Sequence, residues 1–320
     1  MSKHRLLLCI VAAIAIHGSA VAQDYPTRPI RLVVPAGGGG AMDPISRNMA
    51  LALEKILGQA VIVENKPGGG GMVGAVQVVN SPADGYTLLV TSSALPSALA
   101  VRRTSPVRLE QIDSITVIAE TPLALSRGPG LPYNTLPELI AYAKANPGTI
   151  NFGANGLGST SHLLGEKFAI DAKISIVPVM FNAAAQSWLA LLGGQLHITI
   201  DNLVSSMAHT RDGKAKILAV SSQKRSQFVP EIATFAELGL PNVATTAWYG
   251  LGAPAGTPAA VMQRLEAAVL EASRSTELRE KLIGMGAVPV FSTRAQSSEK
   301  AKSDFQYWQE ISSKLGIKID

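Results

Sequence analysis

The stretch IRLVVPAGGGGAMDP, residues 30–44, decides the fold of this chain. Its apolar run at 30–34 predicts a buried strand, glycines follow, and Asp43 before Pro44 is a favoured helix start, with Asp43 as the expected N-cap. A second stretch, NFGANGLGSTSH at 151–162, repeats this order of strand, glycine-rich turn and helix. Such a turn leaves unpaired N–H groups at the positive end of a helix dipole, which suits an anion. Two such turns, one from each half of the chain, predict a site for one small anion.

The N-terminus has the features of a secretory signal peptide. Lys3 and Arg5 precede an apolar run at 6–16 that is too short to span a bilayer, and the A-x-A pattern at 20–22 fits a cleavage site. We expect cleavage after Ala22, with an uncleaved anchor as the alternative. Cleavage would also remove the single cysteine, so no disulfide or thiolate site is expected in the mature chain.

Charge and motif content exclude several function classes. The chain has 28 Lys and Arg against 23 Asp and Glu, without a basic run, so no nucleic-acid partner is expected. The histidines are dispersed without metal-ligand spacing, so we expect no metal site. The G-x-G-x-x-G letters at 69–74 lack the dinucleotide-binding context, because residues 65–67 separate them from the strand and no acidic residue follows at the required spacing. We therefore expect no cofactor and interpret these glycines as a flexible turn.

Predicted strands and helices alternate along the chain. The first unit has strands at 30–34, 60–64 and 87–91 with helices between them, an order that predicts a parallel, doubly wound sheet. A second unit starts near Leu123 and has strands at 150–153, 174–179, 196–200 and 217–221. An extended run at 247–253 and helices at 258–276 and 293–315 follow, the last interrupted near its start.

The polar clusters of the chain fall where predicted strands end. Ligands of open parallel sheets bind at the carboxyl ends of strands. Residues 37–43, 91–93, 153–162 and 201–202 all lie at such ends. These segments therefore form the predicted cleft, whereas His197 and Trp188 are expected to be structural.

A serine hydrolase is the enzymatic alternative. It would use Ser159 or Ser161 with His162, three residues close together at one predicted helix start. Residues that are neighbours at one helix start can hardly place a nucleophile, a base and an orienting acid in the geometry of a catalytic triad. The sequence also has no G-x-S-x-G nucleophile elbow. We therefore expect that the protein is not an enzyme.

A set of short motifs extends over the whole chain after the predicted signal peptide. They are YPTRPI (25–30), VIVENKPG (61–68), DGYTLL (84–89), SHL (161–163), LLGGQ (191–195), DN (201–202), LAV (218–220), KRS (224–226) and APAGTP (253–258). Together, in this order and spacing, they resemble the periplasmic substrate-binding receptors of tripartite tricarboxylate transporters, also called the Bug family.

The resemblance implies an α/β, two-lobed periplasmic-binding-protein fold of the Venus-flytrap type, with two doubly wound sheets and a hinge. Lobe 1 would combine 23–124 with 245–320, and lobe 2 would span 125–244. The implied function is a monomeric periplasmic receptor that captures a small carboxylate-type metabolite and delivers it to inner-membrane permease subunits. A ligand-presenting co-receptor for a sensor kinase is the alternative.

The resemblance also implies ligand-binding residues. The first turn would contribute Gly39, Gly40, Ala41 and Asp43, and the second turn Asn155, Gly156, Ser159, Thr160 and Ser161. Thr91, Ser92 and Asp201 match further cleft positions, and from the sequence we add His162, Phe181 and Asn182.

The sequence departs from the family pattern at two places. The family's first turn usually has Pro-Pro before Gly-Gly, whereas this chain has Ala36 followed by glycines, which predicts a looser loop. The family often has Tyr-Lys/Arg-Gly after the fifth strand, whereas this chain has Phe181-Asn182-Ala183. The missing cation favours a monocarboxylate, an amide or an aromatic acid over a di- or tricarboxylate.

Overall fold

The computed structural model describes residues 25–38 and 40–319. The predicted signal peptide therefore lies outside the described residues, and so does Gly39 of the first turn. Within the described ranges, no helix combines the length and the apolar character that a membrane span requires.

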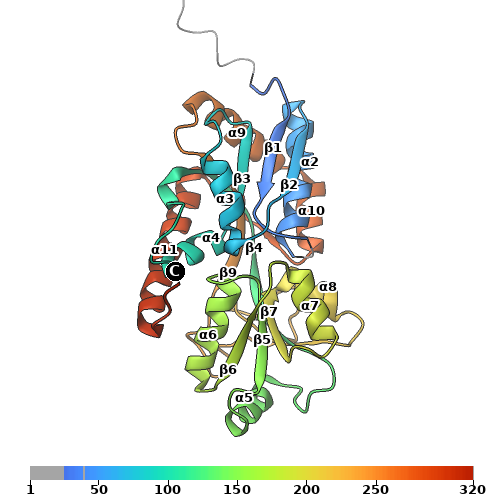
Figure 1. Cartoon of the computed structure of the whole chain (residues 1–320). Helices are drawn as coiled ribbons and strands as arrows, with labels where there is room; N and C mark the ends of the chain where they lie inside the picture. Colours follow the sequence, from blue (N-terminus) through green and yellow to red (C-terminus); the bar gives the residue numbers. More distant parts are fainter. Residues whose placement is uncertain (1–24, 39, 320) are drawn as a thin grey trace, which may run out of the picture.

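One long strand, β4 (Ile112–Arg127), belongs to both halves of the molecule (Figure 1). Its first part pairs antiparallel with β9 (Thr246–Pro254), up to the pair Pro122–Thr246. From Leu123 onward it pairs antiparallel with β7 (Ile198–Asn202), and from Ala124 also with β8 (Lys216–Val220). The chain thus forms two lobes that share one continuous strand.

The sheet of the first lobe is mixed. Its order is β2 (Val61–Asn65), β1 (Ile30–Val34), β3 (Thr87–Ser92), β9 and β4, with β10 (Val288–Pro289) beside β4. The first three strands are parallel, as predicted, whereas β9 is antiparallel to both its neighbours. The parallel order predicted for the first three strands is therefore confirmed, and β9, for which no direction was predicted, makes the sheet mixed.

The sheet of the second lobe is mixed in the same way. Strands β5 (Ile150–Ala154), β6 (Ile176–Met180) and β7 are parallel, and β4 runs against them. The same physical reason applies to both lobes. The carboxyl ends of the parallel strands of the two lobes face each other. A strand that crosses from one lobe into the other therefore enters at these carboxyl ends and runs antiparallel to the strands of the lobe it enters.

Helices cover both faces of the first lobe. On one face α2 (Met42–Leu57), α9 (Ala259–Ala272) and α10 (Thr276–Gly284) pack on Leu32 and Val34, and on the other α3 (Met72–Val79) and α4 (Ala94–Val101) pack on Val33. This division follows from the alternation of side chains along β1. Helix α2 places Ile45, Met49 and Leu53 in the core at helical spacing. Short 3₁₀ turns lie at Gly69–Gly71 and Leu109–Gln111.

The second lobe contains α5 (Leu136–Ala145), α6 (Thr160–Ala172), α7 (Ala184–Leu192) and α8 (Leu203–Thr210). Its core is centred on Phe152, Phe168 and Phe235, which are almost fully buried. The lobe therefore has a hydrophobic core of its own, separate from the cluster that surrounds β1.

The C-terminal helix contacts both lobes. Helix α11 (Arg294–Leu315) buries Trp308 against Val101 of α4 and Leu163 of α6. It is continuous, so the predicted interruption near its start is wrong; a capping box of Thr293 and Gln296 starts it cleanly. The helix predicted at 258–276 ends earlier, at Ala272, and a second helix, α10, begins at Thr276. It begins there because Ser275 caps it by accepting the N–H of Leu278.

Candidate functional site: a cavity between two helix N-termini

A cavity lies between the lobes, at the carboxyl ends of the parallel strands. It holds about 120 Å³, enough for several water molecules and therefore for one small solute. Its walls come from both lobes, including the first turn, the second turn, the loop before α7 and the ends of β3, β7 and β9. This is the position that the strand-end rule predicts.

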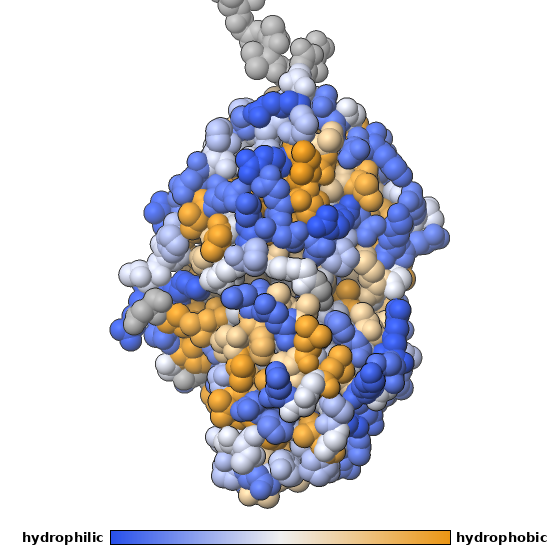
Figure 2. Space-filling view, turned by 45° about the vertical axis from the view of Figure 1, so that its right-hand side comes forward, coloured by the Kyte–Doolittle hydropathy of each residue, from blue (hydrophilic) through white to orange (hydrophobic). Residues whose placement is uncertain are grey.

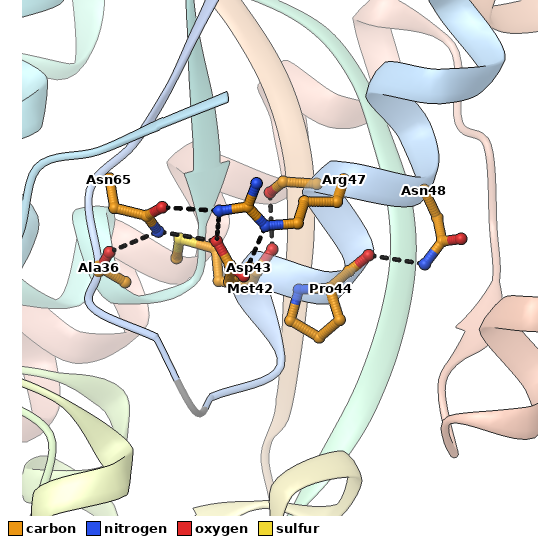
Figure 3. Close-up of polar contacts among 8 residues, drawn as sticks. Ala36, Met42, Asp43, Pro44, Arg47, Asn48 and Asn65 are labelled. Carbon is orange, nitrogen blue, oxygen red and sulfur yellow. Dashed lines mark hydrogen bonds and ion pairs between the residues drawn. The ribbon is translucent and has the colours of Figure 1, made fainter. Parts of the chain in front are cut away.

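The first turn ends in a helix start that differs from the predicted one. Helix α2 begins at Met42 with Ala41 as its N-cap residue, and no side chain caps it. The expectation that Asp43 is the cap is therefore wrong. The Asp43 carboxylate instead accepts two hydrogen bonds from Arg47 (2.9 and 3.1 Å) and one from Asn65 Nδ2 (2.8 Å), as Figure 3 shows.

These contacts keep the acidic side chain of Asp43 out of the cavity lining. Burial alone would raise the pKa of Asp43, but the hydrogen bonds from Arg47 and Asn65 hold it below its usual value. The carboxylate is therefore ionised at neutral pH, and the guanidinium of Arg47 offsets its negative charge. Next to it, the N–H groups of Gly40, Ala41 and Met42 have no hydrogen-bond partner among the described residues.

Asn65 fastens the first turn to β2. Its Nδ2 donates to the carbonyl of Ala36 (3.1 Å) as well as to Asp43, so one side chain bonds to both ends of the glycine loop. Arg47 in turn donates to Asn65 Oδ1 (3.1 Å). No sequence pattern predicted this role, because Asn65 lies far from the loop along the chain.

Replacing Asn65 by alanine should loosen this loop. We expect ligand affinity to fall several-fold, because the ordering of the loop would then have to accompany binding. The free energy of unfolding should fall by only about 1 kcal/mol. Asn48→Ala is the matched control, because it too removes an asparagine amide that donates to a backbone carbonyl. Asn48 lies on α2, its Nδ2 donates to the Pro44 carbonyl (2.8 Å), and its loss leaves the loop fastened by Asn65. Equal affinities of the two variants, measured by calorimetric titration, would contradict this role.

The second turn uses most of its polar groups internally. Ser159 is the N-cap of α6 and accepts the N–H of His162 (3.3 Å), and the N–H of Ser159 donates to the Gly156 carbonyl (3.1 Å). The N–H of Asn155 donates to Ser161 Oγ (3.0 Å). The N–H groups of Thr160 and Ser161, at the first two positions of α6, have no partner among the described residues.

The same geometry argues against hydrolase chemistry. Ser159 Oγ and Ser161 Oγ bond to each other at 3.0 Å. His162 Nδ1 accepts the N–H of Gly158 (3.2 Å), and its Nε2 lies 3.6 Å from Glu166 Oε1. Both imidazole nitrogens therefore face other groups than the two serines, and no serine–histidine pair forms.

Asp201 organises the floor of the cavity. It is 1% exposed, and its Oδ1 accepts from Asn155 Nδ2 (2.8 Å) and from the N–H and Nδ2 of Asn202 (2.8 and 3.2 Å). Its Oδ2 accepts from Trp188 Nε1 (2.8 Å). Burial raises the pKa of Asp201, and hydrogen bonds from Ser205, Trp188, Asn202 and Asn155 oppose that rise. This carboxylate thus joins the second turn to α7 and α8.

The lobes meet along both margins of the cavity through small residues. On one margin, a Cβ on Gly37 would lie 2.8 Å from Ala183 Cβ; on the other, a Cβ on Gly156 would lie 3.2 Å from Gly70 Cα. Between them, Thr160 Oγ1 donates to Ser93 Oγ (3.2 Å) across the lobes. On the face in Figure 2, pale residues of intermediate hydropathy lie along the boundary between the upper and lower halves.

Most residues predicted for the cleft line this cavity. They are Gly40, Ala41, Ser92, Asn155, Gly156, Ser159, Thr160, Ser161, Phe181, Asn182 and Asp201. Three predicted residues are not part of the lining, namely Asp43, Thr91 and His162, and Gly39 lies outside the described residues. Trp188 is fully buried, as predicted, although it holds Asp201.

Sequence reasoning missed several lining residues. Ser93 and Asn202 lie in the predicted cleft segments 91–93 and 201–202, but neither was named as a ligand-binding residue. Tyr249, 3% exposed, had no sequence signal, because it lies inside β9. Gly70 and Gly71, in the segment 69–74 that we interpreted as a flexible turn, also line the cavity, as does Gly68. Among the described residues, no group of three or more His, Cys, Asp or Glu side chains is arranged to hold a metal ion.

A family model for the tripartite tricarboxylate transporter family receptor, TctC, matches residues 45–317. The chain belongs to the TctC family. Protein BugT of Bordetella pertussis is 35% identical to this TctC receptor over 325 residues, which cover 100% of both chains. A structure of R. palustris Rpa4515 with adipate has a TM-score of 0.89 at 32% identity, covering 92% of this chain and 99% of that one.

A structure of the periplasmic binding protein BugD has a TM-score of 0.87 at 28% identity, again covering 92% of this chain and 99% of that one. These findings confirm the predicted family and the two-lobed periplasmic-binding-protein fold. TctC proteins and these neighbours are solute-binding proteins rather than enzymes, in agreement with the sequence-based prediction.

Proposed function

We propose that this TctC receptor works in the periplasm, where it binds one small carboxylate between its lobes and delivers it to the permease of a tripartite tricarboxylate transporter. One observation carries the proposal. Helices α2 and α6, one from each lobe, both begin at the same cavity with unpaired N–H groups. The positive ends of two helix dipoles therefore favour an anion at this place.

The proposed contacts are mainly backbone donors. The N–H groups of Gly40, Ala41 and Met42 from α2, with those of Thr160 and Ser161 from α6, are the available set. Charge-assisted hydrogen bonds of this kind are stronger than neutral ones, so a carboxylate is favoured over a neutral amide of the same shape. The adipate bound in the structure of Rpa4515 is a solute of this class.

We further propose lobe boundaries that agree with the sequence-based division, 23–124 with 245–320 and 125–244. The shared strand β4 changes partners between Pro122 and Leu123, and the chain returns at Thr246, the first residue of β9. Two neighbouring crossings of this kind form a hinge. Ligand that contacts both helix N-termini would stabilise the closed arrangement of the lobes.

Thermal unfolding of ligand-free protein tests this function. At a ligand concentration about 100 times the Kd, binding should add roughly 2.7 kcal/mol to the free energy of unfolding and raise the Tm by about 4 °C. The panel would hold aliphatic and aromatic carboxylates, with the corresponding alcohols as uncharged controls. A shift with alcohols alone, or no shift with any carboxylate, would overturn the proposal.

A further inference from the structure

The segment that follows α11 lies beside the end of α4. Gly316 caps the end of α11 in the left-handed conformation (φ 67°). The N–H of Ile319 then donates to the Val101 carbonyl (2.9 Å), and the N–H of Arg103 donates to the Ile319 carbonyl (2.9 Å). These two backbone hydrogen bonds fasten the 317–319 segment to the first lobe.

The same segment meets the second turn of the other lobe at Gly158. This glycine has a φ of 78°, and a Cβ there would lie 2.9 Å from Val101 Cγ2 and 3.4 Å from Ile319 Cδ1. A residue without a side chain is therefore needed for this close approach. Within its own lobe, the N–H of Gly158 donates to His162 Nδ1 (3.2 Å). The end of the second turn is thus held between the start of α6 and the 317–319 segment with α4.

Helix α11 continues this contact between the lobes, beside α4 and α6 (Figure 1). Its Trp308, 1% exposed, packs in one apolar cluster with Val101 of α4 and Leu163 of α6. The half-buried side chains of Ile317 and Ile319 pack against the same cluster. None of these residues lines the cavity. They therefore join the two lobes without contacting a solute that is bound there.

From these contacts we propose that the 317–319 segment is a latch, which holds the second turn against α4 and stabilises the closed arrangement of the lobes. Movement of α6 away from α4 would expose apolar surface of Trp308, Leu163 and Ile319 to water, which costs free energy. The latch contributes this free energy whether or not a solute is bound, so it raises the fraction of the receptor that can bind one. The inference rests on the proposed function for the role of the second turn, whereas closure itself is measurable without a ligand.

The distance between the lobes in the ligand-free mature chain tests the latch. The one cysteine of the chain, Cys9, lies in the predicted signal peptide, so Leu51→Cys on α2 and Leu189→Cys on α7 give two specific, exposed sites for spin labels. Pulsed electron paramagnetic resonance should give a mainly closed distance for the full mature chain. In a chain that ends at Gly316, the population with a longer distance should rise at least about fivefold. A mainly open full chain, or a distribution that truncation leaves unchanged, overturns the proposal.

Hydrogen exchange of the second turn gives an independent test with a matched pair of point variants. Ile319→Ala removes the side chain that meets Gly158, whereas Ile170→Ala shortens an isoleucine of α6 that is 49% exposed and lies outside the cluster. The amide of Leu163, which donates to the Ser159 carbonyl (3.0 Å), should exchange at least about threefold faster in Ile319→Ala and at an unchanged rate in Ile170→Ala. Equal exchange in the two variants contradicts the latch. If the latch variants behave as expected but no carboxylate raises the Tm of the full chain, the proposed function fails and the latch stands.

Discussion

Replacing Thr160 by proline should weaken binding of a carboxylate ligand by about 10- to 100-fold, the equivalent of one hydrogen bond to a charged group, about 1.5–3 kcal/mol. Thr160 is the first residue of α6, and its N–H has no partner among the described residues. Proline is well accepted at this helix position. The preceding Ser159 has φ −64° and ψ 160°, an extended conformation that a following proline permits. The substitution therefore removes a donor without breaking the helix.

The threonine hydroxyl needs a control of its own, because it bonds to Ser93 across the lobes. Thr160→Val removes the hydroxyl, keeps the N–H and has nearly the same volume. We expect the valine variant to lose less affinity than the proline variant in calorimetric titration. Both should unfold in urea within about 1 kcal/mol of each other. If the two variants bind the carboxylate ligand equally, the backbone of Thr160 does not hold it.

Elements with local start and stop signals were predictable from the sequence. Helix α5 spans Leu136–Ala145, the predicted range, because Thr135 caps it and Asn146-Pro147-Gly148 cannot continue it. The two glycine-rich turns likewise lead into helices at the predicted places. In each case the deciding interactions lie within a few residues along the chain.

Elements that depend on distant partners were not predictable in this way. The first part of β4 had no predicted strand, since it is stabilised by pairing with β9, more than 100 residues later. Helix α4 was not predicted either. Nearly all of its residues are buried, so its sequence is apolar on every side and lacks the alternation of apolar and polar faces that marks an amphipathic helix. The reversed direction of β9 follows from the passage between lobes, which no local pattern encodes.

The candidate site divides along the same line. Its position at strand ends, and the part of its lining that the two turns supply, could be predicted from the sequence. The partners that fix these residues could not: Asn65 holds the first turn from β2, and Asp201 holds the second turn from β7. Both are side-chain contacts between segments that only the tertiary fold brings together.

Asp201→Ala should lower the free energy of unfolding by about 3–5 kcal/mol, the usual cost of removing the acceptor from a buried, charged hydrogen-bond network. The donors of Trp188, Asn155 and Asn202 would remain buried without their shared acceptor. Asp201→Asn should lower the free energy of unfolding by less than Asp201→Ala, because one side-chain oxygen remains as an acceptor. Part of the cost remains, because the new amide group would face one of the N–H donors. Urea unfolding followed by far-ultraviolet circular dichroism measures both changes.

Asp212→Ala is the matched control for this series, because Asp212 is exposed in a loop and accepts only the N–H of Lys214 (3.1 Å) among the described backbone donors. It should change the free energy of unfolding by no more than about 0.5 kcal/mol. The Asp201 variants should also lose affinity, since Asn155, released from Asp201, no longer orients the second turn. An Asp201→Ala protein as stable as Asp212→Ala would mean that the donors of Trp188, Asn155 and Asn202 find other acceptors. The carboxylate would then not be the group that joins the second turn to α7 and α8.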